Sequence, residues 1–228
     1  MLQILNPFRA ASEFRALKTE RKWMLAILMV IIPGLLSVAG DTLEQQKSQQ
    51  LTDQLIEELG TMTDAQKEAM GDIQGLILGI GVVIGIISIF FFWAIKGVVF
   101  HILGSIVSTE KISMSISSTI HLIAFTYPPF FFKGVLDLIN GLRYEPPPYE
   151  VFIQQVRHPD VVASFLGEHN IFWLWAFILM VLAVREQFSL SNKRAFLVVF
   201  IPYVVVFLLQ IALASLGSQV GGIQLGGS

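Results

Sequence analysis

The sequence contains no cysteine, which excludes disulfide bonds and thiolate-ligated metal sites. Charge is scarce as well, because charged side chains make up 14% of the 228 residues and the formal net charge is −2. Such a chain has no overall basic field that would attract nucleic acid. We therefore expect no nucleic-acid partner.

Motifs that carry catalysis are missing too. The sequence has no P-loop, no HExxH zinc pattern and no serine in a GxSxG turn. Its four histidines are scattered without metal-ligand spacing. We expect no metal, no cofactor and no enzymatic activity. His101 and His121 are interpreted as hydrogen-bonded structural residues, with a functional role as the alternative.

Apolar residues are abundant instead. They form 54% of the chain, the mean hydropathy is +0.68, and five runs are long enough to cross a bilayer as helices of about 20 residues. The sequence thus predicts an all-α, polytopic integral membrane protein with a five-helix membrane domain over residues 23–216. The predicted spans are Trp23–Gly40, Ile73–Ile95, Ser117–Ile139, Leu166–Val184 and Phe196–Leu216.

The fourth span is the shortest. Its fully apolar part, Ile171–Val184, would reach only about 21 Å as a helix, so we expect it to include Leu166–Asn170, with Glu168 and His169 at an interface. A protein with four spans is the alternative. The first span could also be compared with a signal peptide, but the 22 residues before it are long for such a leader, and we interpret it as retained.

Lysine and arginine indicate the orientation. Ten of them fall in the N-terminal segment and in the second and fourth loops, whereas four fall in the first and third loops. Because basic segments stay on the cytoplasmic side, we predict a cytoplasmic N-terminus and an external C-terminus in the cell membrane. The loops 41–72 and 140–165 and the tail 217–228 are then external.

The N-terminal segment 1–22 is predicted to be a cytoplasmic interfacial helix. Asn6 is a candidate N-cap and Pro7 suits the first helical position. Basic residues fall among the apolar Ile4, Phe8 and Ala11, so we expect their side chains to extend to anionic lipid headgroups. The predicted headgroup contacts are Arg9, Arg15, Lys18, Arg21 and Lys22.

The third span combines helix breakers with charges. Pro128 and Pro129 remove two helical hydrogen-bond donors and predict a kink whose freed carbonyls need partners in protein or water. Lys133 and Asp137 are four residues apart, so they share a helix face and can form an intramembrane charge pair. A structural pair is one interpretation, and a proton or substrate path is the other.

The second span carries glycines on two faces. Gly75 and Gly79 line one face and Gly81 and Gly85 another, which would let two neighbouring helices approach closely. The stretch GIGVVIG loosely resembles a dinucleotide-binding turn, but it lies inside an apolar span rather than after a strand. We interpret these glycines as helix-packing positions.

Tryptophans and the external loops add two further expectations. All four tryptophans, Trp23, Trp93, Trp173 and Trp175, are expected near span ends, with their indoles in the headgroup zone. The first external loop holds eight acidic residues and an apolar stripe from Leu51 to Met62, which predicts a helical hairpin. It could be a plain solvated surface or a docking site, as could the stripe Val151–Leu166 of the third loop.

Three stretches resemble a known family. They are NPFRAASEFRALKTERKWMLAILMVIIPGLL, GSIVSTEKISMSISSTIHLIAFTYPP and WLWAFILMVLAVREQFSLSNKRAFLVVFIPYVVVFLL. They are similar to the prokaryotic branch of the Yip family, the Rab-interacting five-span membrane proteins. The resemblance implies five helices, a cytoplasmic N-terminus and an external C-terminus.

The resemblance also bears on partners. Eukaryotic members engage Rab-type GTPases through long cytosolic N-terminal regions, whereas this chain has 22 residues there, which argues against a Rab-type partner. Some bacterial relatives resemble accessory subunits of MacB-type ABC exporters that work with a membrane-fusion adaptor. Such a subunit needs no catalytic residues of its own.

The sequence therefore favours a non-enzymatic scaffold or accessory subunit of a membrane transport complex. Its expected partners are the lipid bilayer and another integral membrane protein, such as an ABC permease with its adaptor. One alternative is a small secondary transporter that uses the Lys133 and Asp137 region. A membrane-organising, trafficking-like protein is the other.

Topology is the first testable prediction. Reporters fused after Glu20 and Lys193 should be cytoplasmic and those after Gln50 and Gln155 external, because basic loops resist translocation. Paired alkaline phosphatase and fluorescent protein fusions would measure this. A cytoplasmic reporter at Gln50 would contradict the predicted orientation.

Overall fold

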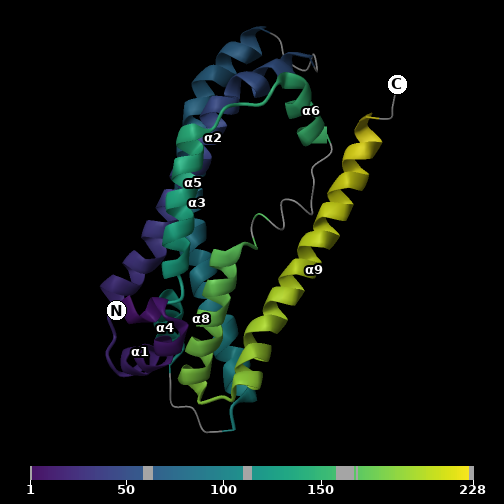
Figure 1. Ribbon diagram of the computed structural model, residues 1–228. Helices are drawn as coiled ribbons and strands as arrows, with labels where there is room; N and C mark the ends of the chain where they lie inside the picture. The colour runs from purple at the N-terminus through teal and green to yellow at the C-terminus, as the bar shows by residue number, and fades with distance from the viewer. Residues whose placement is uncertain (1, 59–63, 110–114, 158–166, 168, 226–228) are drawn as a thin grey trace.

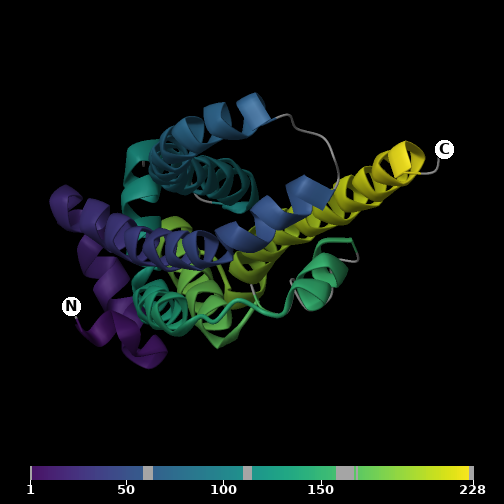
Figure 2. The ribbon, with the colours of Figure 1, turned by 90° about the horizontal axis from the view of Figure 1, so that it is seen from above.

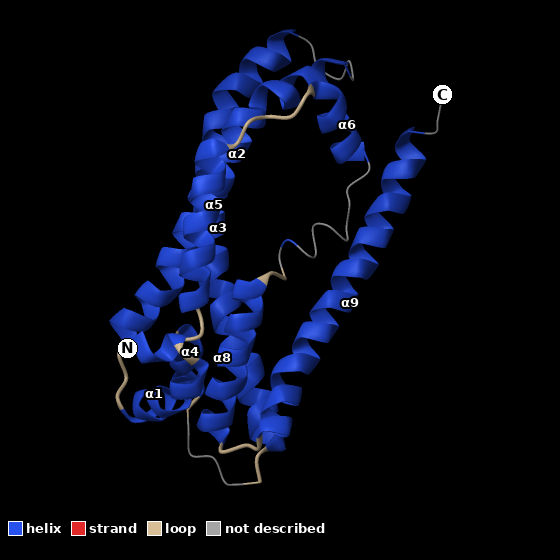
Figure 3. Cartoon of the chain, in the orientation of Figure 1, coloured by secondary structure: helices blue, strands red, loops and turns tan. Residues whose placement is uncertain are grey.

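The described regular structure is entirely helical (Figure 3), as the sequence predicts. The computed structural model describes residues 2–58, 64–109, 115–157, 167 and 169–225. Its elements are η1 (Leu2–Leu5), α1 (Pro7–Thr19), α2 (Trp23–Glu58), α3 (Asp64–Val107), α4 (Ile116–Ala124), α5 (Pro128–Arg143), α6 (Tyr149–Arg157), α8 (Ile171–Phe188) and α9 (Asn192–Leu225).

The long helices run roughly along one common axis and alternate in direction (Figure 1). Within the described residues, four helices are long and apolar enough to cross a membrane, and α4 with α5 forms a fifth span if the bent pair is counted as one. The two chain ends lie at opposite ends of the bundle (Figure 1), and α9 diverges from the other long helices toward its C-terminal end (Figures 1 and 2).

Two helices continue beyond the predicted spans. α2 passes through Gly40 and ends at Glu58, and α3 begins at Asp64 and runs past Ile95 to Val107. The arms of the predicted external hairpin are therefore extensions of α2 and α3, since an amphipathic helix can continue outside the apolar layer. Lys96 follows the second predicted span and was counted with the second loop, but it lies inside α3. Leaving it out of the count keeps the basic asymmetry in the same direction.

The fourth span is shifted relative to the sequence-based expectation. Asn170 caps α8, because its side-chain oxygen accepts hydrogen bonds from the backbone N–H groups of Phe172 at 3.0 Å and Trp173 at 3.3 Å. The helix thus begins at Ile171 and gains its length at the other end, through Phe188. The expectation that Leu166–Asn170 belongs to this helix was wrong at Asn170, and Glu168 lies outside the described residues.

The buried core lies at the end of the bundle where α1, α3, α4 and α8 meet. Trp93 belongs to this core: it is 6% exposed, and its Nε1–H donates to the Ile120 carbonyl at 2.9 Å. Its indole is therefore enclosed by protein, and its ring centroid lies 6.5 Å from that of Trp23, the first residue of α2. The indole hydrogen bond ties α3 to α4.

Among the described elements, α2 and α5 make the most extensive helix–helix contact. Their backbones touch at glycine: a Cβ atom at Gly40 would lie 2.5 Å from the Asp137 carbonyl oxygen, and one at Gly141 would overlap the Gly40 carbonyl. A Cβ at Gly134 would lie 2.8 Å from the Pro33 carbonyl oxygen. Small residues at such a contact maximise packing between helices in lipid. We call this contact the α2–α5 seam.

Gly40→Ala should lower the thermal unfolding midpoint of the detergent-solubilised protein. The added methyl group overlaps backbone, and overpacking of this kind costs about 1–3 kcal/mol. Gly81→Ala is the matched control, since a Cβ there meets no atom within 4 Å. Alanine also has the higher helix propensity, so the control should be neutral or slightly stabilising. Equal unfolding midpoints for both variants would contradict the close backbone contact at the α2–α5 seam.

Candidate functional site

Helix α1 packs on the protein through one apolar face. Ala10, Phe14 and Leu17 recur at helical spacing and are buried, mainly against α8. Asn6 caps the helix by accepting the Phe8 N–H at 3.0 Å, as predicted. Phe8 itself is 94% exposed. The face of α1 that packs on the protein is thus formed by residues 10, 14 and 17, whereas Phe8 points away from the protein, and contact of this helix with lipid stays a prediction.

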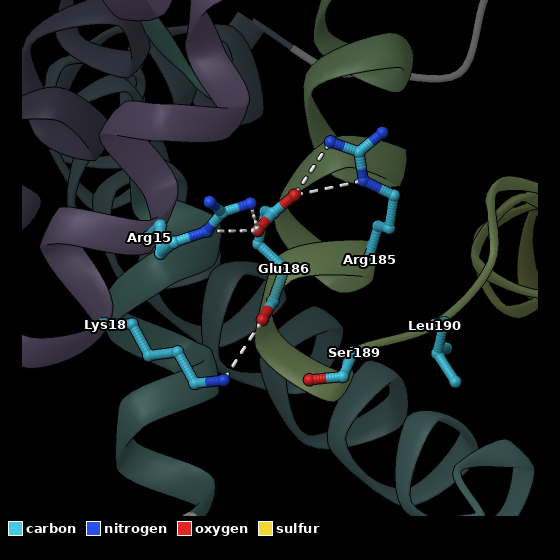
Figure 4. A pocket seen from close by; sticks show the side chains of 6 residues that line it. All are labelled: Arg15, Lys18, Arg185, Glu186, Ser189 and Leu190. Carbon is cyan, nitrogen blue, oxygen red and sulfur yellow. Dashed lines mark hydrogen bonds and ion pairs between the residues drawn. The ribbon is translucent and has the colours of Figure 1, made fainter.

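An ion-pair cluster joins α1 to the end of α8 (Figure 4). Arg15 donates through Nε at 3.1 Å and Nη2 at 3.0 Å to Oε2 of Glu186. Arg185 donates through Nε at 3.1 Å and Nη2 at 2.7 Å to Oε1 of the same carboxylate. Glu186 is thus bracketed by two guanidinium groups. Such charge-assisted, paired hydrogen bonds fix geometry better than single contacts.

Lysine 18 extends this cluster. Its ammonium group donates to the backbone carbonyl of Glu186 at 3.2 Å. Positive charge is favourable near the C-terminal end of a helix, where the last carbonyl groups have no hydrogen-bond donors within the helix. Together with Ser189 and Leu190, the four charged residues line an open pocket of about 440 Å³ (Figure 4). We call it the α1–α8 pocket.

The five predicted headgroup residues do not form one patch. Arg15 and Lys18 meet in the α1–α8 pocket, whereas Arg21 donates to the hydroxyls of Ser117 at 3.4 Å and Ser115 at 3.2 Å. The other two are both exposed: Arg9 lies on α1, and Lys22 pairs with Glu20 at 3.1 Å. Arg185 and Glu186 were missed because Arg15, which joins them in the cluster, lies 171 residues away from Glu186 in the sequence.

Polar side chains link α3, α4 and α8 to one another and to the connection between α1 and α2. His121 accepts the backbone N–H of Lys22 at 2.9 Å through Nε2. Thr119 lies 2.9 Å from Nδ1 of His101 and accepts a hydrogen bond from Gln187 Nε2 at 3.2 Å. Both histidines therefore have hydrogen-bonding partners, in line with their interpretation as structural residues.

A second polar cluster lies on the α2–α5 seam. Asp137 Oδ2 accepts from Lys133 Nζ at 2.7 Å, which is the predicted i,i+4 pair, and also from Ser37 Oγ at 2.7 Å. The two charged side chains are 30% and 20% exposed. The ion pair itself lies within α5, and the hydrogen bond from Ser37 to Asp137 connects it to α2.

Comparison with protein families settles the assignment. The model of the Yip1 domain matches residues 2–214. The chain belongs to the Yip1 domain family. No curated protein and no solved structure shows significant similarity to it. With its apolar helices, this Yip1 domain is a multi-pass membrane protein.

The Yip1 domain breaks its third span at the proline pair. α4 ends at Ala124, Pro128 and Pro129 open α5, and the two helices are bent by 47°. One carbonyl freed by the prolines is satisfied locally, because the Tyr127 N–H bonds Ala124 O at 3.2 Å. No outside donor is needed there.

The predicted glycine faces of α3 are only partly described. A Cβ at Gly85 would contact Val38 of α2 at an ordinary 3.5 Å, and one at Gly81 would meet nothing within 4 Å. The surroundings of Gly75 and Gly79 lie outside the described residues. Close contacts of α3 occur instead at Gly97 and Gly104.

Metal binding finds no support in the part of the chain that is described. There, no group of three or more His, Asp or Glu side chains is placed to hold a metal ion. The two charged clusters instead join helices to each other.

Asp137→Asn should destabilise the Yip1 domain more than the double change Lys133→Met with Asp137→Asn. The single change removes the carboxylate that Lys133 bonds and leaves Asp41 as the nearby negative charge at this half-buried seam, so the loss should be about 1–3 kcal/mol, below that of a fully buried pair. A double-mutant cycle of unfolding midpoints in detergent measures the coupling. Additive losses would show that the two charges act independently.

Proposed function

We propose that this Yip1-domain protein is a non-enzymatic scaffold or accessory subunit of a membrane transport complex. The observation that carries this is the α2–α5 seam, where Asp137 accepts hydrogen bonds from both Lys133 and Ser37. A transport path needs polar groups that face a cavity. Here the charges are engaged where backbones of two helices touch, so they serve to hold α5 on α2.

A lipid-facing surface suitable for a partner lies on α3. Of the four single-helix candidate spans, α3 buries the smallest share of its most apolar window within the chain. Val83, Ile84 and Ile87 are more than half exposed, and Gly81 lies among them in open space. A small residue within an apolar face allows another helix to approach its backbone. A partner helix would therefore pack beside Gly81.

The partner we propose is the permease of a MacB-type ABC exporter with its adaptor, in the cell membrane. The family resemblance described above supports it, and so does the lack of any need for catalytic residues in an accessory subunit. With the N-terminus cytoplasmic, α6 would be external. Val151 and Val156 are exposed on α6 and would be available to an adaptor.

Two other functions have specific support. Lys133 keeps 30% of its side chain exposed, so some access to the ion pair favours a small secondary transporter. The match to the Yip1 domain over residues 2–214 favours a membrane-organising, trafficking-like role. Neither requires a permease partner, which makes co-purification the discriminating experiment.

The tagged protein, expressed at native level and extracted in mild detergent, should co-purify in near-stoichiometric amount with an ABC permease. Gly81→Leu should reduce the recovered permease, because the larger side chain keeps a partner helix away from α3. Val205→Leu is the matched control, since it enlarges an exposed apolar residue of α9.

Two results would contradict the proposal. Recovery of the wild type only as a monomer would argue against a scaffold. Substrate uptake by vesicles that contain the purified protein alone would favour the transporter. Equal permease recovery with Gly81→Leu and Val205→Leu would show that the permease does not contact α3 beside Gly81.

A further inference from the structure

The α1–α8 pocket keeps an excess of positive charge after its internal pairs are made. Arg15, Lys18 and Arg185 face a single carboxylate, that of Glu186, so the lining carries two more positive charges than negative ones. Its volume of about 440 Å³ falls within the roughly 300–1,000 Å³ of small-molecule sites.

Donors remain available in the pocket. Glu186 engages Nε and Nη2 of Arg15, which leaves the Nη1 group, and the Arg15 side chain is 73% exposed. Lys18 uses one of its three N–H donors on the Glu186 carbonyl. The Ser189 hydroxyl also lines the pocket (Figure 4). A guanidinium edge, an ammonium group and a hydroxyl together can donate hydrogen bonds to the oxygens of a phosphoryl group.

The position of the pocket indicates the source of the phosphoryl group. It lies where the apolar helix α8 ends and α9 begins, which is headgroup depth for helices that cross a bilayer. The first turns of α9 expose Phe196 and Leu197, beside which acyl chains could lie. A free anion would gain nothing from such a surface.

We propose that the α1–α8 pocket binds the phosphoryl group of an anionic lipid headgroup. Arg15 and Lys18 contact the phosphate, and the Glu186 carboxylate, which is shared between Arg15 and Arg185, competes with the phosphate for Arg15. Arg9 and Arg21 do not line the pocket and take no part. The site involves no partner subunit. Experiments on lipid binding therefore test this proposal separately from the proposed accessory role.

Lipid retention by the full-length protein tests the site. The purified protein is exchanged into detergent with either phosphatidylglycerol or phosphatidylcholine, and bound lipid is counted by native mass spectrometry. The wild type should retain phosphatidylglycerol in preference. Lys18→Gln should lower that retention about fivefold or more, because it removes a charge-assisted contact while leaving both arginines on Glu186. Arg15→Gln should act in the same direction.

Glu186→Gln separates binding from structure. It removes the competing negative charge, so it should raise phosphatidylglycerol retention even while it weakens the contact between α1 and α8. Lys193→Gln is the matched control: it removes an exposed charge at the same end of the bundle, outside the pocket, and should change retention less than twofold.

Competition with glycerol phosphate distinguishes a lipid from a soluble anion. Millimolar glycerol phosphate should leave phosphatidylglycerol bound, and its displacement of the lipid would assign the pocket to a free phosphoryl compound instead. Equal losses for Lys18→Gln and Lys193→Gln would show attraction by general surface charge and overturn the site. A loss with Glu186→Gln, or no preference for the anionic lipid, would overturn it as well.

Discussion

Backbone contact between α2 and α5 is the interaction on which the rest of this fold depends. Lipid supplies little hydrophobic force to bring helices together, so association relies on close packing and on hydrogen bonds between helices. Gly40 and Gly141 permit that packing, and it places Ser37 at hydrogen-bonding distance from Asp137. With α5 held along α2, the chain bends by 47° before it, and α4 meets Trp93 of α3 through the Ile120 carbonyl.

Charge has a joining role at both polar clusters. On the α2–α5 seam, an i,i+4 pair within one helix also bonds a hydroxyl of the next helix. At the end of α8, one carboxylate holds two arginines, of which Arg15 comes from α1. In each place the opposite charges reduce the penalty of leaving water. The pocket cluster differs in keeping unpaired donors and net positive charge, which is why it can recruit an anion.

Local features were readable from residues close in sequence. The Asn6 cap with Pro7, the proline break and the Lys133–Asp137 spacing each depend on neighbours within about one turn, and each has the expected geometry. The pocket was not readable, because Arg15 and Glu186 are distant in sequence and neither residue type alone indicates the other. The packing face of α1 was missed for a related reason: its spacing was visible, but its partner α8 was not.

Composition and apolar run length by themselves determined that this is an all-helical membrane protein of four or five candidate spans, since a bilayer admits few other structures for such runs. The ends of the helices were decided by tertiary structure. α8 begins at its Asn170 cap and can run on through Glu186 because Arg15, from another helix, helps to neutralise that carboxylate. Which glycines bring helices together was also decided there, since close approach depends on which backbone lies opposite.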